Sequence, residues 1–232
     1  MKTTLITGAN RGIGLELARQ YAADGWSVLA CSRDPDRSDA LNKLAAQFPE
    51  HVNVYALDVA DHAQIERLAK LLADESIDLL INNAGIYPDS DKKDFGYTDY
   101  AEWEQAFRVN TMAPLKMAEA FTAQVARSAH KTIVTISSKM GSIADNSGGG
   151  NYLYRSSKAA VNMVVKSLAI DLKRQGITAV VFHPGWVKTD MGGPGAMIST
   201  QQSVSGMRQV IGSLTMKDTG QFFAYDGQPI PW

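Results

Sequence analysis

Near its start the chain carries the segment that is most informative for its fold, Thr3-Thr4-Leu5-Ile6-Thr7-Gly8-Ala9-Asn10-Arg11-Gly12-Ile13-Gly14. Its first five residues are β-branched or apolar, as in a buried strand, and apolar residues then recur at helical spacing after Gly14. Glycine permits positive φ and close approach of a ligand, and the first amides of a helix bind phosphate well. Glycine also serves ordinary tight turns, and this spacing departs from the common G-x-G-x-x-G, so the turn alone is weak evidence. The stretch predicts a strand, a phosphate-binding turn and a helix.

Composition narrows the class of protein. The 232 residues are 45% hydrophobic, with no apolar run long enough to cross a bilayer and no secretory leader. Lys+Arg 23 against Asp+Glu 24, without a basic stripe, argues against nucleic acid or a membrane as partner and favours a small molecule. The single cysteine, Cys31, excludes an internal disulfide framework, and the four histidines lack metal-ligand spacing. We therefore expect a cytoplasmic protein without a metal site.

Strand and helix signals alternate along the rest of the chain without a linker. Apolar or β-branched runs predict strands at 27–31, 52–57, 77–81, 132–136, 177–182 and 222–224. Helical periodicity predicts helices at about 36–48, 61–72, 102–130, 154–175 and 199–213. Residues 86–100 are polar and turn-rich and predict a surface loop, and Pro114 is expected to bend its helix. The pattern predicts one α/β domain over residues 1–232, a Rossmann fold with a doubly wound parallel sheet of about seven strands and helices on both faces.

The second predicted strand ends at Ser32-Arg33, where many nucleotide-binding folds carry an acidic residue for the ribose hydroxyls. Arg11 lies in the glycine turn. Its guanidinium and that of Arg33 can converge on a phosphate at the ribose 2′ position, because guanidinium matches phosphate geometry. Both arginines are also compatible with solvated surface positions. The combination favours NADP(H) over NAD(H).

Two further strand ends carry polar residues. Asp58, which precedes Val59, can accept a hydrogen bond from an adenine amino group or cap the helix that begins near Asp61. The tetrapeptide Asn82-Asn83-Ala84-Gly85 follows the strand at 77–81. Ligands of parallel sheets lie beyond the carboxyl ends of the strands, so this tetrapeptide contacts the cofactor or braces the sheet.

Tyr154-Arg155-Ser156-Ser157-Lys158 opens a long apolar helix. A tyrosine and a lysine four residues apart lie on one helix face, so the ammonium can act on the acidity of the phenol. A free phenol titrates near ~10, so forming phenolate at neutral pH costs about 4 kcal/mol, and a neighbouring cation reduces that cost. The pattern also occurs by chance on ordinary surface helices, so other motifs must decide.

Together these motifs resemble the short-chain dehydrogenase/reductase family. The resemblance covers almost the whole chain, and it is carried by Thr7-Gly8-x-x-x-Gly12-Ile13-Gly14, Asn82-Asn83-Ala84-Gly85, Ser138, Tyr154-x-x-x-Lys158 and Pro184-Gly185. Within the family, two stretches of the C-terminal part, residues 185–193 and 225–232, are most similar to the C-factor and sniffer-like carbonyl reductase branch. The interval between Ser138 and Tyr154 is a few residues longer than is usual in the family, which predicts a reshaped pocket mouth.

The resemblance implies roles for four catalytic residues. Tyr154 would be the general acid/base, and Lys158 would lower its pKa and bind the nicotinamide ribose. Ser138, in the family's Ser-x-x-Gly pattern, would donate to the substrate carbonyl oxygen, and Ser137 would face away because strand neighbours alternate. Asn110 would anchor a water linked to Lys158, although a hydrogen-bonded structural asparagine explains it equally well.

The resemblance also implies the cofactor site. Its expected residues are Gly8, Asn10, Arg11, Gly12, Ile13, Gly14, Ser32, Arg33, Asp58, Val59, Asn82, Ala84, Gly85, Tyr154, Lys158, Pro184, Gly185, Val187 and Thr189. The expected function is NADPH-dependent, reversible reduction of the carbonyl of a small aldehyde, ketone or quinone to an alcohol. The alternative is an NAD(P)-binding signalling or sensor protein of C-factor type with little turnover.

Two expectations concern larger features. Residues from about 185 to 213 are expected to form a substrate lid, because glycines at 192, 193 and 195 leave the backbone many states. The helices at about 102–128 and 154–175 are apolar on more sides than one sheet contact covers, which predicts a homo-oligomer, a dimer or tetramer. Apolar residues at 140, 143, 152, 186, 191 and 197 either line a substrate pocket or belong to the core.

Overall fold

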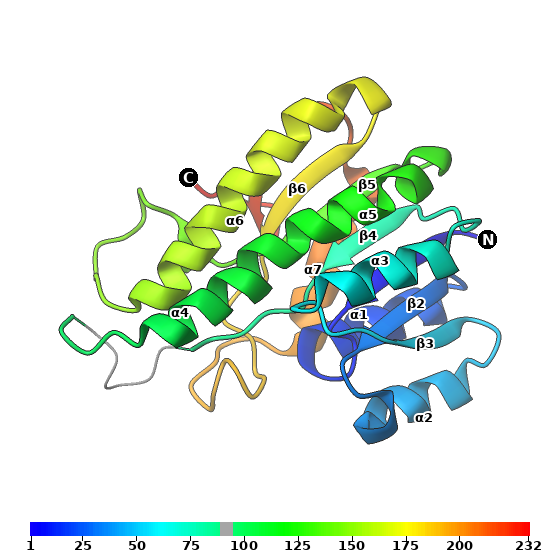
Figure 1. The fold of residues 1–232 in the computed structure, drawn as a ribbon, viewed down its shortest axis with the longest axis horizontal. Helices are drawn as coiled ribbons and strands as arrows, with labels where there is room; N and C mark the ends of the chain where they lie inside the picture. Colours follow the sequence, from blue (N-terminus) through cyan, green and yellow to red (C-terminus); the bar gives the residue numbers. More distant parts are fainter. Residues whose placement is uncertain (89–94) are drawn as a thin grey trace.

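Seven parallel strands form one sheet in the order β3-β2-β1-β4-β5-β6-β7. This computed structural model describes residues 1–88 and 95–232 (Figure 1). The strands are β1 Thr3–Thr7, β2 Ser27–Ser32, β3 Val52–Ala56, β4 Leu79–Asn82, β5 Thr132–Ile136, β6 Thr178–His183 and β7 Phe222–Ala224. The strand order reverses between β1 and β4, which is the point where open α/β sheets bind ligands. The predicted Rossmann fold is confirmed.

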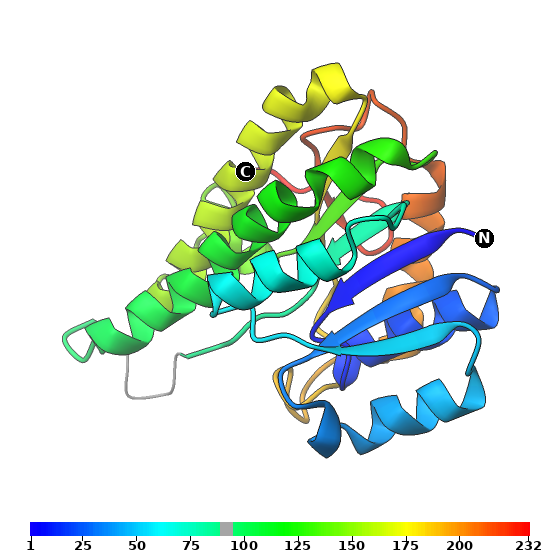
Figure 2. The same cartoon turned by 45° about the vertical axis from the view of Figure 1, so that its right-hand side comes forward.

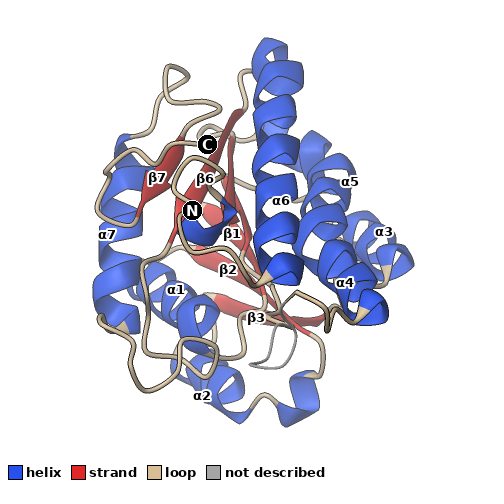
Figure 3. Ribbon diagram, turned by 90° about the vertical axis from the view of Figure 1, so that its left-hand side faces the viewer, coloured by secondary structure: helices blue, strands red, loops and turns tan. Residues whose placement is uncertain are grey.

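Helices cover both faces of the sheet (Figures 2 and 3). The α-helices are α1 Gly12–Ala23, α2 Asp39–Gln47, α3 His62–Leu71, α4 Tyr100–Phe107, α5 Ala113–Arg127, α6 Tyr152–Asp171 and α7 Thr200–Ser213. Short 3₁₀ turns occupy Pro35–Arg37, Lys139–Gly141 and Leu172–Gln175. Figure 3 shows α1, α2 and α7 on one face and α3, α4, α5 and α6 on the other. Within the described ranges, no helix is both long and apolar enough to span a bilayer.

The sheet is buried on both faces because its strands are apolar nearly throughout. Every residue of β1 and of β5 is buried. Adjacent residues of β4 enter different cores: Leu80 packs with Phe121 of α5, and Ile81 packs with Leu17 of α1. One hydrophobic core lies on each face of the sheet. Together the two cores fix the positions of the strand ends, and the site is built on those ends.

The segment expected as one long helix bent at Pro114 is different in the structure. α4 is followed by a five-residue π-helical turn, Arg108–Met112, and Pro114 lies in the first turn of α5. Proline is tolerated in a first turn because its missing N–H has no acceptor there. The π-helical turn buries Asn110. This local change, and not a bend at proline, turns the asparagine inward.

Other boundaries differ by small amounts from those expected. β4 begins at Leu79 and not at residue 77, and α6 begins two residues before Tyr154. The expected surface loop over 86–100 includes residues 89–94, which lie outside the described residues. The described parts of that loop, before α4 begins at Tyr100, contain neither helix nor strand. None of these differences moves a strand end that carries a predicted site residue.

Candidate active site

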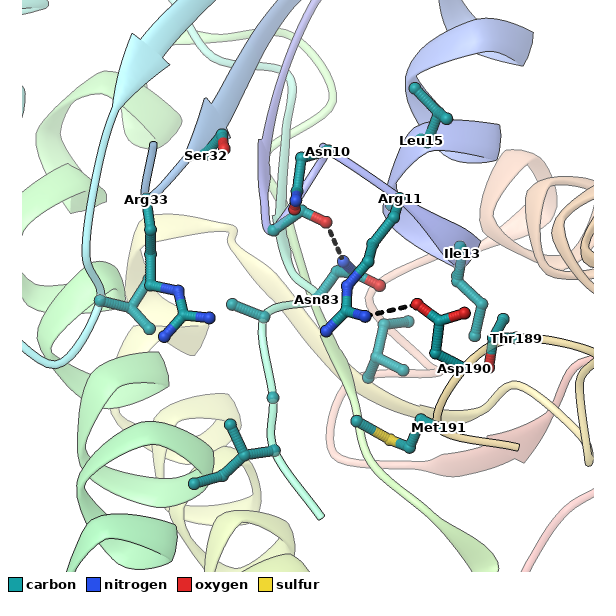
Figure 4. Close-up of a pocket in the computed structure, with 18 of the residues that line it drawn as sticks. Asn10, Arg11, Ile13, Leu15, Ser32, Arg33, Asn83, Thr189, Asp190 and Met191 are labelled. Atoms are coloured by element: carbon teal, nitrogen blue, oxygen red, sulfur yellow. Dashed lines mark hydrogen bonds and ion pairs between the residues drawn. The ribbon is translucent and has the colours of Figure 1, made fainter. Parts of the chain in front are cut away.

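A cleft of about 720 Å³ lies beyond the carboxyl ends of the strands (Figure 4). It brings together the glycine turn, the ends of β2 and β4, the first turns of α6 and the loop after β6. Sixteen of the expected cofactor residues line it: Gly8, Asn10, Arg11, Gly12, Ile13, Gly14, Ser32, Arg33, Asp58, Val59, Ala84, Gly85, Tyr154, Lys158, Pro184 and Thr189. Residues from both ends of the sequence therefore share one elongated site.

The glycine turn has the backbone that its sequence requires. Gly8 and Gly12 have φ of +66° and +55°, which L side chains rarely adopt. A Cβ at Gly14 would lie 2.1 Å from the carbonyl oxygen of Gly8, so only glycine lets α1 pack this closely against β1. The first amides of α1 have no acceptor within the helix. The turn therefore presents them to the cleft as a phosphate cradle.

Asn83, which lies between two expected cofactor residues, braces this turn. Its Nδ2 donates hydrogen bonds to the carbonyl oxygens of Thr7 at 2.9 Å and Gly8 at 3.1 Å. The Thr7 hydroxyl oxygen accepts from the backbone N–H groups of Asn83 and Ala84, both at 3.0 Å. Sequence reasoning left open whether the tetrapeptide contacts the cofactor or braces the sheet. In the structure Asn83 braces the turn and also lines the cleft, together with Ala84 and Gly85.

Three expected cofactor residues do not line the cleft. Asn82 is buried, and its Nδ2 lies 3.5 Å from both the Pro114 carbonyl oxygen and the Thr135 hydroxyl. Gly185 and Val187 form the base of the loop after β6, where a Cβ at Gly185 would meet Ile198 at 2.5 Å. The side chains of Asn82 and Val187 are buried, and Ile198 fills the space beside Gly185. Any cofactor contact at these three residues would therefore come from the backbone.

Asp58 does not cap α3. The Asp61 carboxylate caps it by accepting from the N–H groups of Ala63 and Gln64, at 3.0 Å and 3.3 Å. Asp58 instead accepts from the Ala60 N–H at 2.9 Å and lines the cleft. The adenine contact expected of Asp58 remains a prediction.

Four arginines line the cleft: Arg11, Arg19, Arg33 and Arg37. Figure 4 shows Arg11 and Arg33 projecting into the same space, and Arg37 also lines it. Arg11 forms an ion pair with Asp190 at 2.5 Å, and Arg37 pairs with Asp34 at 3.5 Å. Sequence reasoning missed Arg37, although its spacing of four residues from Arg33 was a signal.

Ser32 is buried and hydrogen-bonded internally. Its hydroxyl lies 2.7 Å from that of Ser38, which donates to the Asp34 carbonyl oxygen at 2.6 Å. A hydroxyl has one proton, so Ser32 must donate to Ser38 and keeps only acceptor capacity. The arginines, and not the Ser32 hydroxyl, are therefore the groups here suited to an anion.

Tyr154 and Lys158 lie at the inner end of the cleft, in the first two turns of α6. Their exposed fractions are 8% and 5%. The Lys158 Nζ donates to the Ile136 carbonyl oxygen at 3.0 Å, and it lies 5.7 Å from the centroid of the Tyr154 ring. Ser138 is hydrogen-bonded to Tyr154, whereas the Ser137 hydroxyl lies 2.7 Å from the Asn162 Oδ1. Ser138 and not Ser137 therefore faces the phenol, as strand alternation predicts.

Burial dominates the acid–base properties of this pair. It raises the pKa of the Tyr154 phenol to about 12, against a smaller lowering by the hydrogen bond with Ser138. It lowers the pKa of the Lys158 ammonium to about 8. Burial dominates the pKa of Tyr154 in this structure, and the lowering expected from Lys158 remains a prediction. At neutral pH the phenol keeps its proton and the ammonium is mostly charged.

Asn110 is fully engaged as a donor. Its Nδ2 donates to the Ile86 carbonyl oxygen at 2.9 Å and the Ser157 hydroxyl at 3.0 Å, and its Oδ1 accepts from the Ile86 N–H at 2.9 Å. An amide oxygen has two lone pairs, so Oδ1 can accept one more hydrogen bond. The residue ties the π-helical turn to α6, and a water-anchoring role would have to use that lone pair.

Aromatic and apolar side chains lie next to Tyr154 and on the exposed surface of the protein. Tyr87 packs against Tyr154 with ring centroids 4.6 Å apart, and its hydroxyl donates to the Asn151 Oδ1 at 2.5 Å. Five of the apolar residues left open between pocket and core are exposed: Ile143, Tyr152, Trp186, Met191 and Met197. Met191 also lines the cleft. These residues are therefore not core.

The strand order, the glycine cradle and the buried Ser-Tyr-Lys group define an oxidoreductase with a dinucleotide site. The family model for short chain dehydrogenases matches residues 2–196, and the chain belongs to this family. The C-signal protein of Myxococcus xanthus is 42% identical over 156 residues, 67% of this chain and 93% of that protein. These findings confirm the family resemblance of the sequence.

Two solved structures are similar over nearly their whole length. The carbonyl reductase Sniffer of D. melanogaster has a TM-score of 0.92 and 32% identity, covering 100% of both chains. The NADPH-bound carbonyl reductase from chicken fatty liver has a TM-score of 0.92 and 34% identity, covering 100% of this chain and 99% of that one. The chain is thus an enzyme of the short-chain dehydrogenase/reductase family with carbonyl reductases among its structural neighbours.

Proposed function

We propose that this protein is an NADPH-dependent reductase that converts the carbonyl of a small aldehyde, ketone or quinone to an alcohol. The observation that carries the proposal is a single cleft lined by Tyr154, Lys158, Arg11 and Arg33, in which the buried Tyr154 is hydrogen-bonded to Ser138. NADP(H) is the expected cofactor, as in the NADPH-bound neighbour. When bound, it supplies the hydride.

The residues of the cleft fit such a dinucleotide. The cleft volume, about 720 Å³, lies within the ordinary range of ligand sites. The α1 amides at Gly12 and Ile13 would hold the diphosphate, and Arg33 and Arg11 would hold a ribose 2′-phosphate. Lys158 would contact the nicotinamide ribose. This division places the charged groups at the outer end and the proton-transfer groups at the inner end.

Tyr154 acts as the proton donor in the reductive direction. Its phenol is protonated at neutral pH because burial raises its pKa to about 12, so the donor is loaded before substrate binds. Ser138 donates to the carbonyl oxygen and stabilises the negative charge that develops there. Lys158 stabilises the phenolate left after transfer, since a charge this close in a dry site acts strongly. General acid catalysis of this kind contributes about 10²–10⁴-fold in rate.

The alternative, an NAD(P)-binding sensor with little turnover, remains distinguishable by experiment. Similarity to the C-signal protein motivates it. The enzyme is better supported, because all three proton-transfer side chains are intact and buried together. A binding protein would have no physical need to bury a lysine ammonium beside a phenol.

NADPH oxidation across a panel of aldehydes, ketones and quinones tests the proposal. The exposed rings of Tyr87, Tyr152 and Trp186 favour apolar, planar substrates. We expect turnover to rise with substrate hydrophobicity. Tight NADPH binding without oxidation by any member of the panel would favour the sensor.

We propose that residues 185–213 cover the bound nicotinamide. The loop at the start of this segment is already ordered: Trp186 Nε1 donates to the Gly192 carbonyl oxygen at 2.7 Å, and the Lys188 N–H to that of Ile198 at 2.9 Å. We therefore expect it to move as a unit and not as a flexible chain. Hydrogen exchange should show added protection there with NADPH, and unchanged exchange at saturation would contradict cofactor-linked closure.

We also propose a homodimer formed through the outer faces of α5 and α6. Met163 and Ile170 on α6 are each 67% exposed, although the helix lies over the sheet. Two large apolar side chains seven residues apart on one face favour a covered surface. Light scattering at micromolar concentration should give a mass near twice that of one chain, and a monomer would contradict the proposal.

A further inference from the structure

Arg11 and Asp190 join two distant parts of the chain across the cleft. The Arg11 guanidinium, in the glycine turn, lies 2.5 Å from a carboxylate oxygen of Asp190, in the loop after β6 (Figure 4). Both side chains are well exposed, at 67% and 77%. Both residues also line the cleft. An ion pair therefore occupies an arginine that the proposed function assigns to the cofactor.

Asp190 is held in this position by its own loop. The N–H groups of Gly192 and Gly193 donate to the hydroxyl and carbonyl oxygens of Thr189, at 3.1 Å and 3.0 Å. The Thr189 side chain packs on the glycine turn, because a Cβ at Gly12 would lie 3.2 Å from it. Tight packing of the preceding residue fixes the base of Asp190. The carboxylate is thus presented to Arg11 by the fold.

Arg11 has two anionic partners to choose between. An exposed arginine–carboxylate pair is weak, because water screens it. A phosphate carries more charge and accepts two guanidinium hydrogen bonds at once, so it is the stronger partner. The Asp190 carboxylate accepts from one guanidinium nitrogen of Arg11, so a 2′-phosphate that takes both terminal nitrogens must compete with it. A cofactor without that phosphate leaves the pair intact.

We propose that Asp190 is a specificity-determining residue that competes with the cofactor's 2′-phosphate for Arg11. This inference rests on the proposed function, in which Arg11 binds that phosphate. Asp190 then weakens NADPH binding and leaves NADH binding nearly unchanged. The loop that would cover the nicotinamide thereby sets how strongly the enzyme discriminates between the two cofactors.

Asp190→Asn tests this inference, because it removes the charge and keeps the shape. Dissociation constants for NADPH and NADH are measured by protein fluorescence at low ionic strength. We expect NADPH to bind about fivefold more tightly, which matches the strength of an exposed ion pair, and the gain to fade as salt is added. NADH should change by less than about twofold. Equal changes for both cofactors, or none, would overturn the inference.

Asp74→Asn is the matched control, since Asp74 is exposed and lies outside the cleft. It should leave the ratio of the two dissociation constants unchanged, and a change equal to that of Asp190→Asn would overturn the inference by showing only a net-charge effect.

Arg11→Ala separates the two proposals. If it weakens both cofactors equally, the phosphate role of Arg11 fails, and with it the inference. If it weakens NADPH selectively while Asp190→Asn does nothing, only the Asp190 inference fails. In the double variant with Arg11→Ala, Asp190→Asn should bring no gain in NADPH affinity.

Discussion

The Lys158 Nζ lies 5.7 Å from the centroid of the Tyr154 ring and is anchored by the Ile136 carbonyl oxygen at 3.0 Å. The ammonium therefore stays beside the phenol, held by a backbone carbonyl and not by a carboxylate. A fixed positive charge acts most strongly when the neighbouring group becomes negative, and Tyr154 does so only after it gives up its proton. This relationship between two side chains predicts the behaviour of several variants.

Tyr154→Phe should abolish turnover and leave NADPH binding nearly intact, because the change removes the proton and keeps the ring. Steady-state kinetics and a binding titration measure the two effects separately. Tyr152→Phe is a suitable control, since Tyr152 is exposed and lies two residues earlier on the same helix. Activity of the Tyr154 variant within about tenfold of the parent would contradict the role of general acid.

Lys158→Met should stabilise the fold at neutral pH and abolish activity. Burial lowers the pKa of Lys158 from 10.5 to about 8, so keeping the ammonium charged inside the protein costs roughly 3 kcal/mol. The unfolded chain binds more protons between these two values, and wild-type stability therefore rises with pH across that window. The advantage of the variant should be full below pH 8 and vanish by about pH 10.5.

Denaturant unfolding of both proteins at several pH values checks this prediction. A variant that is less stable than wild type at neutral pH would show that packing or the hydrogen bond to Ile136 outweighs desolvation. A stability difference that does not depend on pH would show that the lysine ammonium is not the cause.

Arg33→Ala should weaken NADPH binding much more than NADH binding. Each charge-assisted hydrogen bond to a phosphate is worth roughly 1.5–3 kcal/mol, so the ratio of affinities should change by at least about tenfold. Lys43→Ala, which removes an exposed charge outside the cleft, is the control. Equal losses for the two cofactors would assign Arg33 another role.

Gly192→Ala should impair catalysis by distorting the loop after β6. An added Cβ would lie 2.0 Å from the Val187 carbonyl oxygen, so the backbone must shift. Gly212→Ala is the matched control, because a Cβ there meets nothing within 4 Å and alanine favours the helix by up to about 1 kcal/mol. We expect kcat/KM to fall in the first variant only. Normal kinetics for Gly192→Ala would show that the loop adapts without cost to the site.

The sequence predicted the strands, their parallel arrangement and sixteen of the residues that line the cleft, because these depend on local patterns. Alternating strand and helix signals specify the sheet, and the glycines at 8, 12 and 14 directly reflect backbone geometry. The order of motifs along the chain then placed Tyr154 and Lys158 at the same edge as the glycine turn. Each of these inferences needed only nearby residues.

Pairings between distant side chains could not be predicted in this way. Arg11 and Asp190 are 179 residues apart, and nothing local shows that the loop after β6 returns to the glycine turn. The inward direction of Asn110 depends on a π-helical turn, and the pKa of Tyr154 depends on how many atoms bury it. These properties come from tertiary packing.

Isotope transfer shows whether the protein moves a hydride from NADPH to a carbonyl carbon. NADPH deuterated at both C4 positions is incubated with the best carbonyl substrate of the panel, and the alcohol is examined by mass spectrometry. We expect one deuterium on the carbinol carbon with the wild-type protein and no detectable alcohol with Tyr154→Phe. Bound NADPH with no deuterated alcohol from any aldehyde, ketone or quinone would contradict it.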